Sequence, residues 1–178
     1  MKHSQVFRTA GQALLVSLVT LSLATSSHAT ERLDEQSIKA AFLFNFAIFV
    51  TWPRPATADQ PFVVCVIGDT GIVAELTRAN RKTVHGREFV VREQNPGSDP
   101  DACQILFVTE GADRYAPAIL RRIHGPVLTI GETPFFLREG GMMRFLIVDE
   151  RVKFQIDGGA AERAGLRIGS QLLSVAAK

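Results

Sequence analysis

Apolar residues are concentrated in one stretch of the chain, residues 38–52, which is followed by Pro53. Steps of three and four residues connect a set that we expect to face the core: Ile38, Phe42, Asn45, Phe49 and Trp52, with Ala41, Phe46 and Val50 beside it. The opposite side is apolar as well, with Leu43, Phe44, Ala47 and Ile48. The pattern predicts a helix over residues 38–52 that is buried on two sides, capped by Asp34 or Ser37 and ended by Pro53.

After a polar linker at residues 54–61, short apolar runs alternate with helical spacing. The runs predict six strands, at residues 62–67, 87–91, 103–108, 127–130, 142–148 and 151–156. Helical spacing appears at residues 72–79 and 111–123, a single helical turn at 135–137, and two short helical pieces within 158–178, the second expected to bury Leu172, Leu173 and Val175. The last two strands surround Asp149 and Glu150, a polar turn that predicts an antiparallel hairpin. We therefore expect an α/β fold, with a mostly parallel mixed sheet of about six strands flanked by helices on both faces.

The first 29 residues have the features of a signal peptide. Lys2 and Arg8 precede an uncharged apolar run at residues 10–24, and small residues follow at Ser27 and Ala29. The apolar run is shorter than the roughly 20 residues that span a bilayer. We expect cleavage after Ala29, export of a single domain comprising residues 30–178, and no insertion of the mature chain into the membrane.

Charge gives no indication of a nucleic-acid partner. The whole chain has 20 Lys and Arg against 18 Asp and Glu, and the predicted leader removes two basic residues and no acidic one. The mature domain is then formally neutral, whereas proteins that bind nucleic acid or anionic lipid carry excess positive charge.

Two cysteines, Cys65 and Cys103, lie in or at the start of predicted strands. If these strands are neighbours, a disulfide would close a loop of about 38 residues and stabilise the domain by up to about 4 kcal/mol. The alternatives are a redox pair and metal ligands. A CxxC motif is missing and no histidine lies at ligand spacing, which favours structural pairing.

Candidate catalytic groups are sparse. His85 and His124 are the only histidines after the predicted leader, and neither GxSxG nor HExxH occurs. The motifs of the sequence supply no activated nucleophile, no general base and no set of metal ligands. We therefore expect no enzyme activity, no bound metal and no cofactor. A regulatory module that binds another protein is the first interpretation, and a small-molecule binding protein with a crevice at the strand ends near Gly68, Gly131 and Glu132 is the second. A hydrolase is third, and it requires acidic residues that converge with His85 or His124 in the fold.

Several segments of the chain together form a pattern that one protein family shares. The run KAAFLFNFAIFVTWP at residues 39–53 resembles the opening signature of the YfiR family of periplasmic regulators. The likeness continues through CVIGD (65–69), CQILFV (103–108), VLTIGE (127–132), the glycine pair 140–141, VKFQID (152–157) and LRIGSQLL (166–173). The second cysteine pair that members commonly carry near residues 140–148 is missing from this chain.

The resemblance implies an α/β sandwich and a periplasmic repressor. Such a protein binds the periplasmic sensor domain of an inner-membrane diguanylate cyclase, holds it inactive, and thereby lowers cyclic di-GMP signalling and biofilm formation. An outer-membrane lipoprotein with a peptidoglycan-binding domain relieves the repression by sequestering the regulator. Cys65 and Cys103 match the remaining cysteine pair of the family.

Large apolar side chains on the helix over residues 38–52 are the candidate anchors for a partner or for a homodimer. A standard interface of about 1,600 Å² requires a few such anchors. Phe44 and Ile48, on the less regular face, are the first candidates, followed by Phe42 and Trp52. The same side chains could instead belong to the core.

Overall fold

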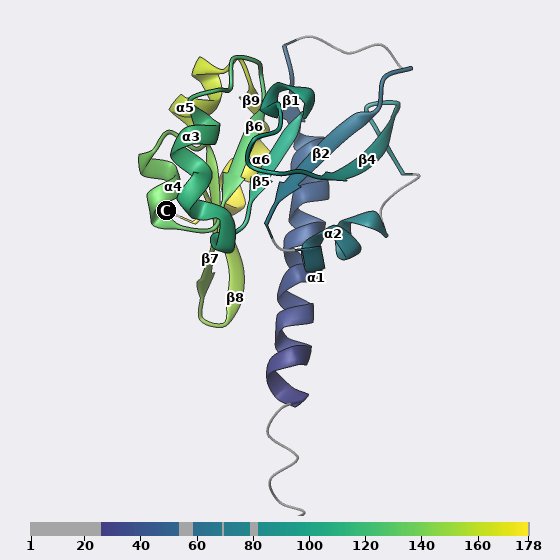
Figure 1. The fold of residues 1–178 in the computed structure, drawn as a ribbon, viewed down its shortest axis with the longest axis vertical. Helices are drawn as coiled ribbons and strands as arrows, with labels where there is room; N and C mark the ends of the chain where they lie inside the picture. Colours follow the sequence, from purple (N-terminus) through teal and green to yellow (C-terminus); the bar gives the residue numbers. More distant parts are fainter. Residues whose placement is uncertain (1–25, 54–58, 69, 79–81, 178) are drawn as a thin grey trace, which may run out of the picture. The chain divides into compact units, whose positions relative to one another are not determined.

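The structure is a computed structural model that describes residues 26–53, 59–68, 70–78 and 82–177 (Figure 1). The chain divides into two units, Met1–Asp34 and Glu35–Lys178, and the fold below is that of the second unit. Most of the predicted signal peptide, residues 1–25, lies outside the described residues. The boundary at residue 29 therefore stays a prediction.

A seven-stranded sheet forms the centre of the second unit, counted over its described residues. Its order is β3 (Thr83–Val84), β4 (Arg87–Glu93), β2 (Phe62–Ile67), β5 (Ile105–Val108), β6 (Leu128–Gly131), β7 (Met143–Val148) and β8 (Arg151–Ile156). The five strands from β4 to β7 run parallel, and the two edge strands are antiparallel to their neighbours. The predicted mostly parallel mixed sheet is confirmed, with β3 as an additional short edge strand.

The apolar runs become strands because burial on both faces suits them. All six residues of β2 are buried, as expected for a central parallel strand. Between β7 and β8, Asp149 and Glu150 have φ values of 49° and 59°. Two successive left-handed residues make a type I′ turn, whose twist matches that of a hairpin. The predicted hairpin is confirmed, and β8 has the bounds that were predicted for it.

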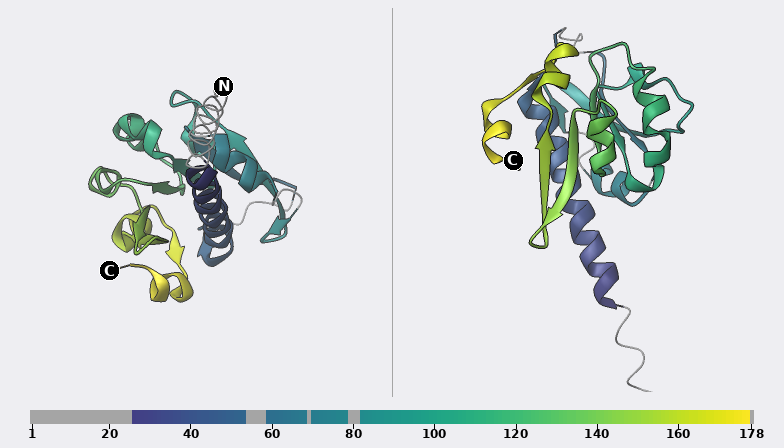
Figure 2. Two further views of the ribbon diagram at one scale, coloured as in Figure 1. Left: turned by 90° about the horizontal axis from the view of Figure 1, so that it is seen from below. Right: turned by 90° about the vertical axis from the view of Figure 1, so that its left-hand side faces the viewer.

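Helices cover both faces of the sheet (Figure 2). One face packs on α1, α2 (Thr70–Thr77), α5 (Gly158–Arg163) and α6 (Ser170–Val175). The other face packs on the 3-10 helix η2 (Glu110–Tyr115), on α3 (Ala116–Leu120) and on α4 (Pro134–Arg138), while a second 3-10 helix, η1 (Pro100–Ala102), precedes β5. The predicted layers are confirmed, but the expected burial of α6 is wrong in part. Leu172 is buried, whereas Leu173 and Val175 are 51% and 60% exposed.

The first helix, α1 (Ser26–Phe49), differs from its prediction at both ends. Asp34 and Ser37 lie inside the helix, so neither caps its start. Its last residue is Phe49, because Val50 and Thr51 form β1 (Val50–Thr51), which pairs antiparallel with β9 (Arg167–Ile168). The backbone N–H of Gly169 also donates to the carbonyl of Phe49, at 2.9 Å. Pairing with a distant segment therefore ends the helix before Pro53.

Among the described residues, α1 included, we find no helix with enough length and apolar character to span a membrane.

Candidate partner-binding surface

The side of α1 that meets the sheet is made of Leu43, Phe46, Ala47 and Val50, all fully buried. The Phe46 ring lies 4.9 Å from the ring of Phe154 on β8, in an edge-to-face arrangement. The predicted core face is wrong in part: Phe46 and Val50, expected beside it, are buried, whereas Ile38 and Phe49 are exposed, so the helix is not buried on two sides. Both sides of the helix are apolar in sequence, so periodicity alone does not show which side meets the sheet.

An apolar stripe is left exposed on the other side of α1. We define the α1 stripe as Ile38, Ala41, Asn45, Ile48 and Phe49, all of which are exposed. Ile38, Ile48 and Phe49 are 45%, 40% and 38% exposed, respectively. Large apolar side chains that gather on one exposed side of a helix, here around Asn45, are candidate anchors for a protein partner. Sequence reasoning missed Ile38 and Phe49, because their spacing was interpreted as that of the core face.

The four predicted interface residues lie in different environments. Ile48 belongs to the α1 stripe. Phe44 is partly buried: its ring lies edge-on to Phe89, with centroids 5.1 Å apart, and the ammonium of Lys82 lies 5.1 Å from the same ring. Phe44 therefore has neighbours from β4 and from the segment just before β3.

Phe42 and Trp52 are also partly buried against the core. Phe42 lies 5.2 Å from Phe154 in an edge-to-face contact, and Trp52 lies 5.0 Å from Phe62 in the same way. The indole N–H of Trp52 is buried and has no hydrogen-bond partner in the described part of the chain. The structure therefore brings these two rings to the sheet and leaves Ile48 the most accessible of the predicted set.

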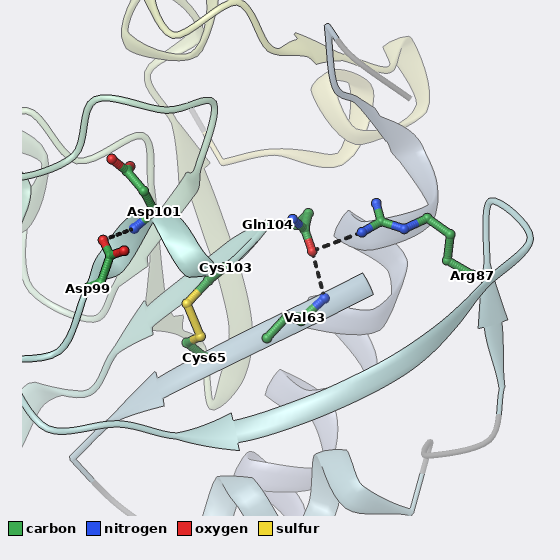
Figure 3. The surroundings of a disulfide bond; sticks show 7 residues. All are labelled: Val63, Cys65, Arg87, Asp99, Asp101, Cys103 and Gln104. Carbon is green, nitrogen blue, oxygen red and sulfur yellow. Dashed lines mark hydrogen bonds between the residues drawn. A yellow bond between two sulfur atoms is a disulfide. The ribbon is translucent and has the colours of Figure 1, made fainter. Parts of the chain in front are cut away.

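Cys65 and Cys103 form a disulfide bond on the opposite face of the sheet (Figure 3). Their Cα atoms are 5.9 Å apart, and both residues are almost completely buried. Cys65 lies on β2, whereas Cys103 precedes β5 instead of lying within a strand. Because β2 and β5 are neighbours, the bond connects the middle of β2 to the chain just before β5.

Polar contacts beside the disulfide hold three strands together (Figure 3). The side-chain oxygen of Gln104 accepts from the backbone N–H of Val63 at 2.7 Å and from the guanidinium of Arg87 at 3.4 Å. Arg87 also donates to the carbonyls of Gln60, at 2.8 Å, and Pro61. Burial lowers the pKa of the Arg87 guanidinium. These bonds have a structural role, since together they connect β2, the segment before it, β4 and the residue before β5.

At the strand ends where a crevice was expected, the described residues pack closely on one another. A side-chain carbon added at Gly68 would lie 2.0 Å from the hydroxyl of Thr109, and one added at Gly131 would lie 2.3 Å from the ring of Phe136. Glu132 forms an ion pair with Lys39 of α1 and accepts from the backbone N–H of Glu110. These contacts weigh against a ligand site at this edge.

Both histidines after the predicted leader lie in connecting segments, His85 between β3 and β4 and His124 after α3. His85 lies in the turn between β3 and β4 with φ of 52°, and its imidazole is hydrogen bonded to the carbonyl of Ala47, at 2.9 Å. That carbonyl belongs to the last turn of α1, so His85 supports the end of the helix. Among the described residues, no group of three or more His, Cys, Asp and Glu side chains is placed to hold a metal ion.

Comparison with solved structures identifies a similar fold. A conserved domain protein from Vibrio cholerae O1 biovar El Tor str. N16961 aligns with a TM-score of 0.55 and 10% sequence identity. The alignment covers 79% of this chain and 58% of the length of the Vibrio chain. At this identity, the likeness concerns the fold alone. No curated protein matches the sequence.

A family model described as YfiR/HmsC-like matches residues 36–177. This range includes α1 from residue 36 to its end, the whole seven-stranded sheet, both cysteines and α6. Because the match covers most of the chain, this protein belongs to the YfiR/HmsC-like family.

Proposed function

We propose that this protein is a periplasmic regulator that binds the sensor domain of an inner-membrane diguanylate cyclase and holds the cyclase inactive. Membership of the YfiR/HmsC-like family over residues 36–177 is the observation that carries this proposal. The signal-peptide pattern of residues 1–29 and the disulfide between Cys65 and Cys103 are consistent with export, because disulfides persist in oxidising compartments.

Repression by this protein requires binding and no chemical step. The α1 stripe supplies three large apolar side chains, Ile38, Ile48 and Phe49, on one exposed side of a helix. A few anchors of this size supply most of the binding free energy in a typical interface. We assign the stripe to the cyclase sensor domain, and Phe44 lies next to it as a secondary contact. A homodimer through the same surface would compete with the cyclase for it.

Cellular cyclic di-GMP tests the proposal. Deletion of the gene is expected to raise the cyclic di-GMP concentration, and restoration of the chain is expected to lower it again. A restored version with both Cys65 and Cys103 changed to Ala is expected to rescue poorly, because the fold that presents α1 is less stable without the disulfide. A deletion that leaves cyclic di-GMP unchanged in every growth condition would contradict the proposal.

Release from repression is the second part of the proposal. An outer-membrane lipoprotein with a peptidoglycan-binding domain sequesters the regulator and frees the cyclase. Co-purification of the tagged regulator, with and without this class of lipoprotein present, measures the competition. The amount of cyclase recovered with the regulator should fall as the lipoprotein is expressed, and an unchanged amount would argue against sequestration.

A further inference from the structure

A pocket of about 380 Å³ lies apart from the α1 stripe and the disulfide. It is bordered by the end of α3 and the loop that follows, by the turn before β7, and by α5. Its volume is within the range of about 300–1,000 Å³ that small-molecule sites occupy. None of its lining residues belongs to the surface to which we assign the cyclase.

Hydrogen bonds hold the walls of the pocket. The carboxylate of Asp101 accepts from the backbone N–H groups of His124, at 3.1 Å, and Gly125, at 2.9 Å. Arg122 donates to the carbonyls of residues 96 and 97. On the facing wall, the hydroxyl of Thr129 accepts from the backbone N–H of Met142, at 3.1 Å. The loop after α3 and the turn before β7 are therefore fixed in place before any ligand binds.

Two arginine side chains of the lining have no partner among the described residues. Arg121, the residue after α3, and Arg163, the last residue of α5, line the pocket, and neither side chain forms an ion pair or a hydrogen bond with another residue that the structure describes. Arg122, one residue further along, is instead bonded to two carbonyls. With Glu139 as the acidic residue of the lining and His124 neutral, the pocket carries one net positive charge.

Apolar side chains complete the pocket. Leu120, Ile123, Met142 and Ala160 line it, and the last two are 6% and 5% exposed. A ligand that satisfies both parts of the lining has one negative charge and an apolar body. Of the common anionic groups, a carboxylate matches the forked geometry of a guanidinium with a single charge.

We propose that this pocket binds a small monocarboxylate with an apolar body, held by Arg121, which follows α3, and by Arg163 of α5. Such a ligand connects α3 to α5 across the pocket. This inference goes beyond the proposed function and is tested on the purified protein, so its outcome does not depend on the cyclase.

Titration with benzoate, followed by amide NMR spectra of the ¹⁵N-labelled protein, tests the proposal. We expect saturable shifts that are confined to the pocket, including the amides of Gly125, Gly140 and Ala164. Benzamide has the same shape without the charge and should not saturate these shifts. Replacing both arginines (Arg121→Gln with Arg163→Gln) should weaken benzoate binding at least about ten-fold, since each substitution removes a charge-assisted hydrogen bond to the carboxylate.

A matched pair of exposed arginines controls for overall charge. Arg92→Gln with Arg151→Gln removes the same charge from β4 and β8, outside the pocket, and should leave the benzoate affinity within two-fold. Three results would each overturn the proposal: no saturable shift with benzoate, equal saturation by benzamide, or the same loss of affinity in both double variants. Both double variants change exposed side chains, and their amide spectra report directly whether they are folded.

Discussion

At the scale of single residues, Lys39 is the side chain with the most unusual environment. It is 9% exposed and forms ion pairs with Glu35, one turn earlier on α1, and with Glu132, which follows β6. Burial alone lowers the pKa of Lys39, but hydrogen bonds to Glu132 and Glu35 outweigh it and raise that pKa above its ordinary value of 10.5. The residue connects α1 to the carboxyl edge of the sheet through charge.

Replacing this residue (Lys39→Met) is expected to lower the free energy of unfolding by about 2 kcal/mol at pH 7, because Glu132 is left without its cation. Urea denaturation measures the change. The exposed residue Lys153, on β8, provides the control, and Lys153→Met should change stability by less than about 0.5 kcal/mol. A Lys39 variant as stable as the wild type would show that the ion pairs contribute nothing.

The same residue predicts a pH dependence. Because the pKa of Lys39 is raised on folding, its contribution is complete below pH 10.5 and is lost as the pH rises through the folded-state value. The stability difference between wild type and Lys39→Met should therefore narrow above pH 10.5. A difference that stays constant from pH 8 to pH 11.5 would contradict this assignment.

At the scale of elements, α1 has two apolar sides, one buried and one exposed. The buried side packs on β7 and β8 through phenylalanine rings, with Phe46 stacked 5.9 Å from Phe145. On the exposed side, Ile48 belongs to neither of the two core clusters that the described residues form. Substitutions on the two sides of one helix should therefore separate folding from binding.

A charge placed in the α1 stripe (Ile48→Asp) is expected to leave the protein folded and to abolish repression of the cyclase. Circular dichroism measures folding, and cellular cyclic di-GMP measures repression. Phe46→Asp should instead prevent folding, since the ring is fully buried. Leu173→Asp on α6 is the matched control, because Leu173 is similarly exposed and lies outside the stripe. Full repression by a folded Ile48→Asp variant would remove the stripe from the interface.

The disulfide is the other feature that acts between elements. It closes a segment with a sequence separation of 38 residues and connects β2 to the chain just before β5. The double variant Cys65→Ala with Cys103→Ala should lose about 2–4 kcal/mol of stability, because its unfolded chain is less constrained. Urea denaturation of the variant should match that of the wild type under reducing conditions. Equal stability with and without the bond would show that it does not stabilise the fold.

At the scale of the whole second unit, stability should be greatest at the centre of the sheet. Every residue of β2, β5 and β6 is buried, and helices cover both faces. The end of the β7–β8 hairpin is exposed from Ile147 to Glu150. Amide hydrogen exchange should therefore be at least about 1,000-fold slower in the three central strands than at this end, which corresponds to about 4 kcal/mol of opening free energy. Similar rates in both regions would contradict this account of the core.

Much of this arrangement could be predicted from local patterns. Continuous apolar runs identified the central strands, and two polar residues between alternating runs identified the hairpin. These signals are reliable because a strand that is buried on both faces has no position for a charge, and because a two-residue turn requires particular backbone angles. The Cys65–Cys103 pair could be suggested for the same reason, since both cysteines begin or lie in such runs.

The sequence by itself therefore determined the class of fold, the extent of most strands and the apolar character of α1. The tertiary structure alone decided which side of α1 is buried, where that helix ends, and that Leu173 and Val175 are exposed. It also placed Arg121 and Arg163 at one pocket. The physical reason is the same in each case: a residue's own chemistry and spacing specify local conformation, whereas burial depends on which distant segment packs against it.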